Sequence, residues 1–291
     1  MKVLVNDQLV ERDEAKVDIE DRGYQFGDGV YEVVRLYNGQ FFTYEEHIDR
    51  LYASAAKIEL TIPYSKDKLR ELLESLVKEN NIQTGNVYLQ VSRGIQMPRN
   101  HVIPDAFPLE GILTASASNV PRNEGQFVAG GKAITLEDVR WLRCDIKSIS
   151  LLGNILAKNK AHQAGALEAI LHRGDLVTEC SASNVSIIKN GELWTHGADN
   201  LILNGITRQV INQVASEAGI TVHEADFTVQ DLETADEIFI SSTTLEVTPI
   251  INLNGQTVGD GKRGPVTARI HELFEKEIER RCGEGALITA K

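Results

Sequence analysis

The sequence predicts a mixed α+β fold with two domains. Its 291 residues are about twice the length of a typical single domain. Short alternating apolar segments joined by Asn-Gly or Asn-Asp indicate antiparallel strands, and the amphipathic segments between them indicate helices. Because strands and helices alternate without a regular βαβ order, a doubly wound parallel sheet is not expected.

Four hairpin turns are expected where an asparagine separates two apolar segments. They lie at residues 6–7, 38–39, 190–191 and 254–255. Three of these pairs are Asn-Gly, which accepts the positive φ values of a type I′ turn and so matches the twist of paired strands. Antiparallel strands are therefore expected in both halves of the chain.

Three helices are expected in the first 165 residues. Thr43 followed by Glu46 has the spacing of a capping box, which predicts that a helix begins there. Ser65 can cap a second helix, whose leucines repeat on one face. A third is expected over about 150–165.

Two further helices are expected in the second half. One begins near Ile206 and ends at Gly219, a residue suited to the left-handed position after a helix. The last begins at Pro265, since proline is favoured in the first helical turn.

A polar stretch marks the expected domain boundary. It contains Pro121, one of only seven prolines, and we expect an interdomain linker over residues 118–123. This divides a small N-terminal domain, 1–117, from a large C-terminal domain, 124–291.

The charge balance and cysteine pattern limit the class of protein. A net charge of −12 argues against binding to nucleic acid or an anionic membrane surface, and no apolar run is long enough for a bilayer span. The N-terminus has no signal-peptide pattern. Three cysteines without a C-x-x-C pair (Cys144, Cys180 and Cys282) are expected to be reduced and buried in a cytoplasmic protein.

Several segments could bind an anion. The turn before Ile206 leads directly into a helix, whose first N–H groups have no partner within the helix. The hydroxyls of 241–244 follow a predicted strand and could complete a phosphate site or form an ordinary polar turn. Arg50 could hold a phosphate or form a surface ion pair with Glu46.

Other side chains suggest carbonyl and carboxylate chemistry. Lys147 is bordered by apolar residues, and a partly desolvated lysine is a nucleophile for carbonyls, although a surface role is also open. Glu179 could be a surface acid or the partner of a protonated ring nitrogen. Arg99 and His101 could clamp a carboxylate or lie in a solvated turn.

Together these residues resemble a known pattern. The stretch from Glu179 to Arg208 resembles the signature of the class IV, fold-type IV pyridoxal-phosphate aminotransferases. The matching positions are Glu179, Ser181, Asn184, Val185, Thr195 and 203–208. Ser186 departs from it, since the family usually has an aromatic residue there. Within that class, residues 21–32, 47–51 and 140–148 are similar to the D-amino-acid aminotransferases.

The resemblance implies a small N-terminal α/β lobe, a larger C-terminal lobe with a mixed pseudo-barrel sheet, and the cofactor pyridoxal 5′-phosphate, with no metal. It implies that Lys147 carries the cofactor covalently and moves a proton between Cα and C4′. Glu179 would pair with the ring nitrogen and Leu203 would pack on the ring. The implied phosphate ligands are Arg50, Ile206, Thr207 and Thr243.

The implied reaction transfers the amino group of D-alanine and other D-amino acids to 2-oxoglutarate by a ping-pong mechanism. The products are pyruvate, or another 2-oxo acid, and D-glutamate. Tyr31 would line the pocket, and Arg99 and His101 would bind the substrate carboxylate from the other subunit of a homodimer. The alternatives are a branched-chain L-amino-acid or (R)-amine transaminase of the same fold, an aminodeoxychorismate lyase-like enzyme, and a catalytically silent acidic binding protein.

Overall fold

The computed structural model describes residues 1–104 and 109–287, and it forms two compact units. Unit 1 comprises Met1–Pro121, Ile146–Leu151 and Gly285–Lys291. Unit 2 comprises Arg122–Asp145 and Leu152–Glu284. The short segment that contains Lys147 therefore belongs to unit 1, although the chain on both sides of it belongs to unit 2. The domain limits expected from the sequence stay a prediction.

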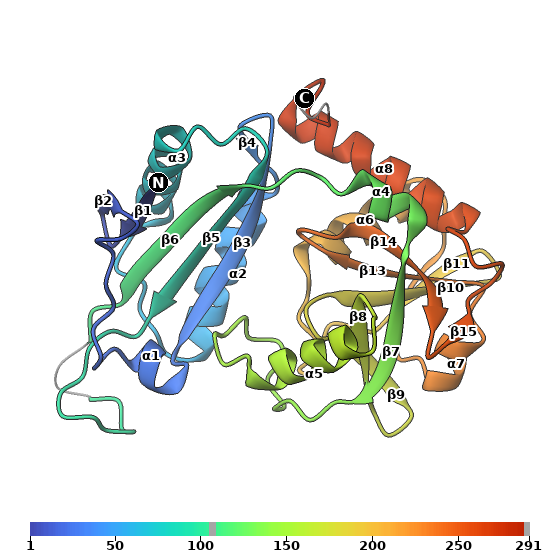
Figure 1. The fold of residues 1–291 in the computed structure, drawn as a ribbon, viewed down its shortest axis with the longest axis horizontal. Helices are drawn as coiled ribbons and strands as arrows, with labels where there is room; N and C mark the ends of the chain where they lie inside the picture. The colour runs from blue at the N-terminus through green and yellow to red at the C-terminus, as the bar shows by residue number, and fades with distance from the viewer. Residues whose placement is uncertain (105–108, 288–291) are drawn as a thin grey trace. The chain divides into compact units, whose positions relative to one another are not determined.

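Unit 1 is built on an antiparallel sheet of six strands (Figure 1). Its strands are β1 (Lys2–Val5), β2 (Gln8–Glu11), β3 (Gly29–Tyr37), β4 (Gln40–Phe41), β5 (Gly85–Ser92) and β6 (Ile112–Asn119). Their spatial order is β2-β1-β6-β5-β3-β4, so the long strands β6, β5 and β3 lie next to one another. In the longest register, Gly29–Leu36 of β3 pairs with Gly85–Ser92 of β5.

Two long helices pack on this sheet. They are α2 (Tyr44–Lys57) and α3 (Lys66–Glu79), and the short α1 (Arg22–Phe26) precedes β3. Ile48 and Leu51 of α2 and Leu69 and Leu73 of α3 are fully buried in one cluster with the strands. Burial of each such side chain contributes about 2 kcal/mol, so this layer fixes α2 against the sheet.

Unit 2 contains a mixed sheet of nine strands that curls into part of a barrel (Figure 1). Its strands are β7 (Gly131–Glu137), β8 (Glu168–Arg173), β9 (Leu176–Cys180), β10 (Asn184–Lys189), β11 (Glu192–Thr195), β12 (Val222–Glu224), β13 (Glu237–Ser242), β14 (Glu246–Leu253) and β15 (Gln256–Thr257). The order is β12-β11-β10-β13-β14-β7-β8-β9, with β15 beside β14. The pairs β14/β7, β7/β8 and β11/β12 are parallel, which confirms the expected mixed sheet.

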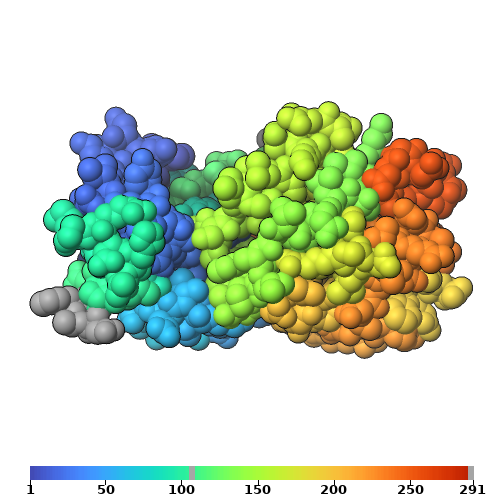
Figure 2. Space-filling model, turned by 90° about the horizontal axis from the view of Figure 1, so that it is seen from below, coloured from blue at the N-terminus to red at the C-terminus, as the bar shows by residue number. Residues whose placement is uncertain are grey.

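Five helices surround or adjoin this sheet in the described part of unit 2. They are α4 (Glu124–Ala129), α5 (Leu152–Gln163), α6 (Ile206–Glu217), α7 (Val229–Glu233) and α8 (Pro265–Cys282). α6 and α8 contact each other and β13, whereas α5 packs on β7 and β8. Figure 2 shows the yellow-green surface around residues 150–160, where Leu152, Ile155 and Leu156 of α5 are more than half exposed.

Most of the expected turns and helix ends are confirmed. All four hairpins form, and Asn6, Asn38, Asn190 and Asn254 have positive φ. The hydroxyl of Ser65 accepts from the backbone N–H of Lys68 and caps α3. The next three helices follow the expected pattern: α5 runs over 152–163, Gly219 is left-handed after α6, and Pro265 is the first residue of α8.

The capping box expected at Thr43 and Glu46 is wrong. Thr43 does precede α2, but its φ of 55° is left-handed and its side chain makes no capping hydrogen bond. Its hydroxyl instead donates to the carbonyl of Phe42. A side-chain cap needs an extended backbone at this position, and the sharp turn out of β4 imposes a different one.

The cysteines and the helix lengths add two observations. Cys144, Cys180 and Cys282 are free thiols and all are buried, as expected. Across residues 1–104 and 109–287, no helix combines the length and the apolar character that a bilayer span requires.

Candidate active site

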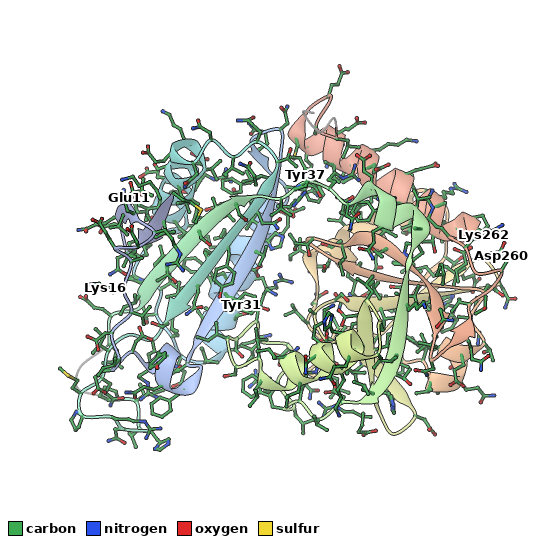
Figure 3. All side chains as sticks on the ribbon, viewed as in Figure 1. Glu11, Lys16, Tyr31, Tyr37, Asp260 and Lys262 are labelled. Carbon is green, nitrogen blue, oxygen red and sulfur yellow. The ribbon has the colours of Figure 1, made fainter. Side chains whose placement is uncertain are left out.

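Lys147 lies beside Tyr31 within unit 1. Its Nζ is 4.2 Å from the centre of the Tyr31 ring, and the side chain is half-buried. Two backbone hydrogen bonds fix the segment: Tyr31 N donates to the Lys147 carbonyl (3.1 Å), and Lys147 N donates to Ser54 Oγ on α2 (3.2 Å). Tyr31 and Tyr37 mark the two ends of β3 in Figure 3. The amine is thus held over an aromatic ring at one end of this strand.

Arg50 is fixed by a buried carboxylate on β3. Its Nε and Nη2 donate to the two oxygens of Glu32 at 2.7 and 2.9 Å, and His47 Nδ1 lies 2.8 Å from Glu32 Oε2. Burial alone would raise the pKa of Glu32, but Arg50 and His47 hold it well below its usual range. Burial lowers the pKa of His47, which favours its neutral form, and Glu32 opposes this only in part. The cluster therefore fixes the direction of the Arg50 guanidinium on α2, the helix whose Ser54 accepts from the backbone of Lys147.

Arg99 and His101 lie on an exposed loop of unit 1 and share one aromatic neighbour. The Arg99 guanidinium carbon is 4.3 Å from the centre of the Phe26 ring, and the His101 ring is 5.1 Å from it. Both side chains are exposed, so they are accessible to a ligand. The sequence spacing thus brings together two potential cations on one aromatic platform.

Glu179 lies at the end of β9 in unit 2 and accepts three hydrogen bonds. Arg140 Nη1 donates to Oε1 (2.6 Å), while Asn184 Nδ2 and the backbone N–H of Leu203 both donate to Oε2 (3.0 Å). Asp138 binds the other side of the Arg140 guanidinium. Burial raises the pKa of Glu179, and Arg140 opposes that rise. This is a buried, oriented carboxylate suited to a cationic ring nitrogen.

The start of α6 offers donors for an anion. Gly205 precedes the helix with an extended backbone and no side-chain cap, so the first N–H groups, at Ile206 and Thr207, are not capped by a side chain. A Cβ at Gly205 would lie 2.1 Å from Asn184 Oδ1, so only glycine allows this close approach. The helix start is thereby packed against the Glu179 network.

The end of β13 supplies hydroxyl groups in the same unit. Ser241 pairs directly with Asn184 of β10, so their side chains share one face of the sheet. Ser241 Oγ is buried and has no hydrogen-bond partner among the described residues. Thr243 follows the strand in a half-buried turn. A buried hydroxyl without a partner at the end of a strand suits hydrogen bonding to an anionic ligand.

The expected residues fall into two groups. Unit 1 contains Lys147, Tyr31, Arg50, Arg99 and His101, and unit 2 contains Glu179, Leu203, Ile206, Thr207 and Thr243. Outside residues 105–108 and 288–291, no cluster of three or more His, Cys, Asp or Glu side chains could hold a metal ion.

Sequence reasoning missed three residues that hold these side chains in place. Glu32 is the partner of Arg50, and Arg140 and Asn184 are the partners of Glu179. The role of Glu32 could have been predicted from the sequence, because a carboxylate in the apolar stretch Val30–Val34 needs a buried partner. The partners of Arg140 and Asn184 are set by tertiary contacts that no local spacing indicates.

Comparison with known families decides the class of protein. The model for "Amino-transferase class IV" matches residues 29–253, which include β3, Lys147, Glu179 and α6. The chain belongs to the class IV aminotransferase family. The matched range covers more than three-quarters of this class IV aminotransferase and parts of both compact units.

Individual relatives match over nearly the whole length. This class IV aminotransferase is 76% identical over 291 residues to a D-alanine aminotransferase of Listeria monocytogenes, with both chains fully covered. It is 48% identical to the D-alanine aminotransferase of Staphylococcus haemolyticus, covering 96% of this chain and 99% of the relative. A T.th. branched-chain amino acid aminotransferase, solved with N-(5′-phosphopyridoxyl)-L-glutamate, has a TM-score of 0.88 and 26% identity, covering 96% of this chain and 94% of that one.

Proposed function

We propose that this chain is a pyridoxal-phosphate-dependent D-amino-acid transaminase. It transfers the amino group of D-alanine to 2-oxoglutarate, giving pyruvate and D-glutamate. The observation that carries this conclusion is 76% identity, over the full length of both chains, to a D-alanine aminotransferase. The structural neighbour solved with a phosphopyridoxyl compound supports the cofactor.

The residues present fit pyridoxal phosphate. Glu179 is a buried carboxylate for a ring nitrogen, the uncapped start of α6 and the unpartnered Ser241 Oγ suit a phosphate, and Lys147 supplies an amine. We assign covalent attachment of the cofactor to Lys147. Glu179 is the proposed partner of the ring nitrogen, and Leu203 is proposed to pack on one face of the ring. Arg50, Ile206, Thr207 and Thr243 are the proposed phosphate ligands. When bound, the cofactor supplies an aldehyde that accepts the amino group and a ring that withdraws electrons from Cα.

Lys147 is the proposed general base. Its amine lies over the Tyr31 ring, and its backbone is tied to β3 and α2, so Nζ has a defined direction in which to take and return a proton.

Arg99 and His101 are the proposed carboxylate clamp, with Tyr31 lining the pocket. Because both side chains lie on one platform at Phe26, they can bind the same substrate carboxylate. A fixed carboxylate decides which enantiomer points its Cα–H toward Lys147. We propose that the clamp serves the other subunit of a homodimer. The three free, buried thiols support a cytoplasmic location.

An amino-donor screen with both enantiomers tests this function. The purified protein should be yellow and should convert D-alanine and 2-oxoglutarate, with little conversion of L-alanine. Lys147→Ala should abolish both the colour and steady turnover, whereas Lys160→Ala, on an exposed face of α5, should leave them unchanged. Full activity in Lys147→Ala would contradict the assignment.

The same screen separates the alternatives. Preference for branched-chain L-amino acids would indicate a branched-chain amino acid aminotransferase, the name of the structural neighbour. Preference for simple (R)-amines would indicate an amine transaminase. Product formed without any oxo acid would indicate a lyase.

Subunit mixing tests the shared site. Lys147→Ala and Arg99→Ala should each be inactive alone, and a mixture exchanged through unfolding and refolding should regain part of the activity. An active monomer in equilibrium sedimentation would rule out the shared clamp.

A further inference from the structure

The loop that carries Arg99 and His101 is exposed, but it rests on a buried arginine. Arg22, in the first turn of α1, is only 5% exposed. Its Nη1 donates to the carbonyl of Asn100 (2.5 Å) and to Gln96 Oε1, and its Nη2 donates to the carbonyl of His101 (3.3 Å). One guanidinium therefore holds the backbone between the two clamp side chains.

Arg22 is itself held rigidly. Its Nε donates to Asp28 Oδ2 at 2.8 Å, and Arg93 Nε donates to the same oxygen at 2.8 Å. Arg93 is equally buried and donates onward to the carbonyls of Ile58 and Glu59, beyond the end of α2. The loop is thus connected through two arginines and one carboxylate to the core of unit 1.

An aromatic platform and a second polar contact complete the support. The Phe26 ring contacts the guanidinium groups of both Arg22 and Arg99, with ring-centre distances of 4.9 and 4.3 Å. Gln96 accepts from Arg22 and donates to the carbonyl of Val102 (3.0 Å), which closes the far side of the loop. These contacts act on the backbone and on Phe26, and they leave the outer faces of the clamp accessible.

We propose that Arg22 is a positioning residue for the substrate carboxylate. By binding the carbonyls of Asn100 and His101, it fixes the loop so that the Arg99 and His101 side chains bind the carboxylate of a D-amino acid in one orientation. This inference rests on the proposed function. A loop that is already held in its binding conformation costs less free energy to order when the carboxylate binds, so the clamp binds substrate more tightly and more selectively.

Steady-state kinetics of holoenzyme variants test it. Arg22→Lys can keep the ion pair with Asp28 but loses the forked donation to the loop. We expect its KM for D-alanine to rise about tenfold, which corresponds to the loss of one or two charge-assisted hydrogen bonds. The kcat and the visible spectrum should change by less than about twofold, because cofactor attachment does not involve this loop. The preference for D- over L-alanine should also fall.

Arg35→Lys is the matched control. Arg35 is a similarly buried arginine of unit 1, and its guanidinium donates to Asn86 Oδ1 and to the carbonyl of Val120, away from the loop. Arg35→Lys should lower Tm by a similar amount and leave KM within about twofold of the wild-type value. An equal rise in KM in both variants would overturn the inference, since Arg22 would then act only through stability.

A milder variant covers the case in which Arg22→Lys does not fold. Gln96→Ala removes one support of the loop and leaves Arg22 and Asp28 in place, so KM should rise about threefold without a change in Tm. If Arg22→Lys is lost to misfolding, an unchanged KM in Gln96→Ala overturns the inference. A wild-type protein without activity toward D-alanine would refute the proposed function instead.

Discussion

Arg140 Nη1 donates to Glu179 Oε1 across 2.6 Å, and the two residues are 39 positions apart in the chain. Burial raises the pKa of Glu179, and the strongest opposing influence is the positive charge of Arg140. Since the proposed role of Glu179 requires a carboxylate, Arg140 supports that role by favouring the ionised form.

Replacing Arg140 should therefore change the pH dependence of the reaction. In Arg140→Gln the pKa of Glu179 rises further, so the carboxyl group takes up a proton at a higher pH. The acidic limb of kcat/KM should therefore move to higher pH than in the wild type, and the loss of activity should be largest at the acidic end of the range. The measurement is kcat/KM for D-alanine between pH 5 and pH 9. Arg143→Gln is the control, because Arg143 is exposed and pairs with Asp145. An unshifted acidic limb in Arg140→Gln would refute this prediction.

Replacing Glu32 should weaken both unit 1 and the proposed phosphate site. Glu32→Gln leaves Arg50 without its carboxylate partner, and loss of one member of a buried pair costs about 3–5 kcal/mol of unfolding free energy. The affinity for pyridoxal phosphate should fall about tenfold, because the Arg50 guanidinium is no longer oriented. Calorimetry of the cofactor-free protein and a spectroscopic cofactor titration measure the two effects.

An exposed ion pair between α2 and α3 provides the control for Glu32. Asp49→Asn removes an exposed ion pair with Lys66, and it should change stability by less than about 1 kcal/mol. Cofactor affinity equal to wild type in Glu32→Gln would mean that Arg50 does not depend on this carboxylate.

Acid should destabilise unit 2 through Glu246. Burial opposes ionisation of this residue, but Arg122 and His271 hold its pKa down to about 2. Because that value is below the ordinary pKa of about 4.3, the stabilisation is complete above pH 5 and is lost as the pH falls toward 2. The contribution is about 3 kcal/mol.

Thermal unfolding at several pH values checks this. Glu246→Gln should have a lower Tm than wild type at pH 7, and the difference should shrink between pH 5 and pH 2. Glu272→Gln, at an exposed position of α8, should follow the wild-type curve. A constant difference across the pH range would contradict the role given to the Glu246 carboxylate.

The three thiols should be unreactive in the folded protein. Burial raises the pKa of Cys144 and of Cys282 to about 11, and it raises the pKa of Cys180 well above its usual range. At pH 7 almost no thiolate is present, and alkylation with iodoacetamide should be slow until the protein is unfolded. Mass spectrometry after alkylation under native and under denaturing conditions gives the number of labelled cysteines. Rapid labelling of any cysteine in the native state would show that its surroundings open.

Local chemistry was sufficient to predict the turns and most helix ends. Asn190-Gly191, Ser65 and Pro265 have conformational preferences that depend on their own backbone and nearest neighbours, so the sequence predicted their structural roles. Thr43 did not follow its local pattern, because the chain leaves β4 through a left-handed turn.

The residue types of the candidate site were also predictable, but their partners were not. Lys147, Glu179 and the helix start at Ile206 were identified from the sequence by a resemblance that extends over most of the chain. Arg22 donates to the carbonyl of Asn100, which is 78 positions away in the chain, and Arg50 donates to Glu32, which is 18 positions away. Such pairs form only when strands and helices pack. A buried charge needs a partner because burial of an isolated charge is costly, but the tertiary structure determines which opposite charge or carbonyl lies within reach.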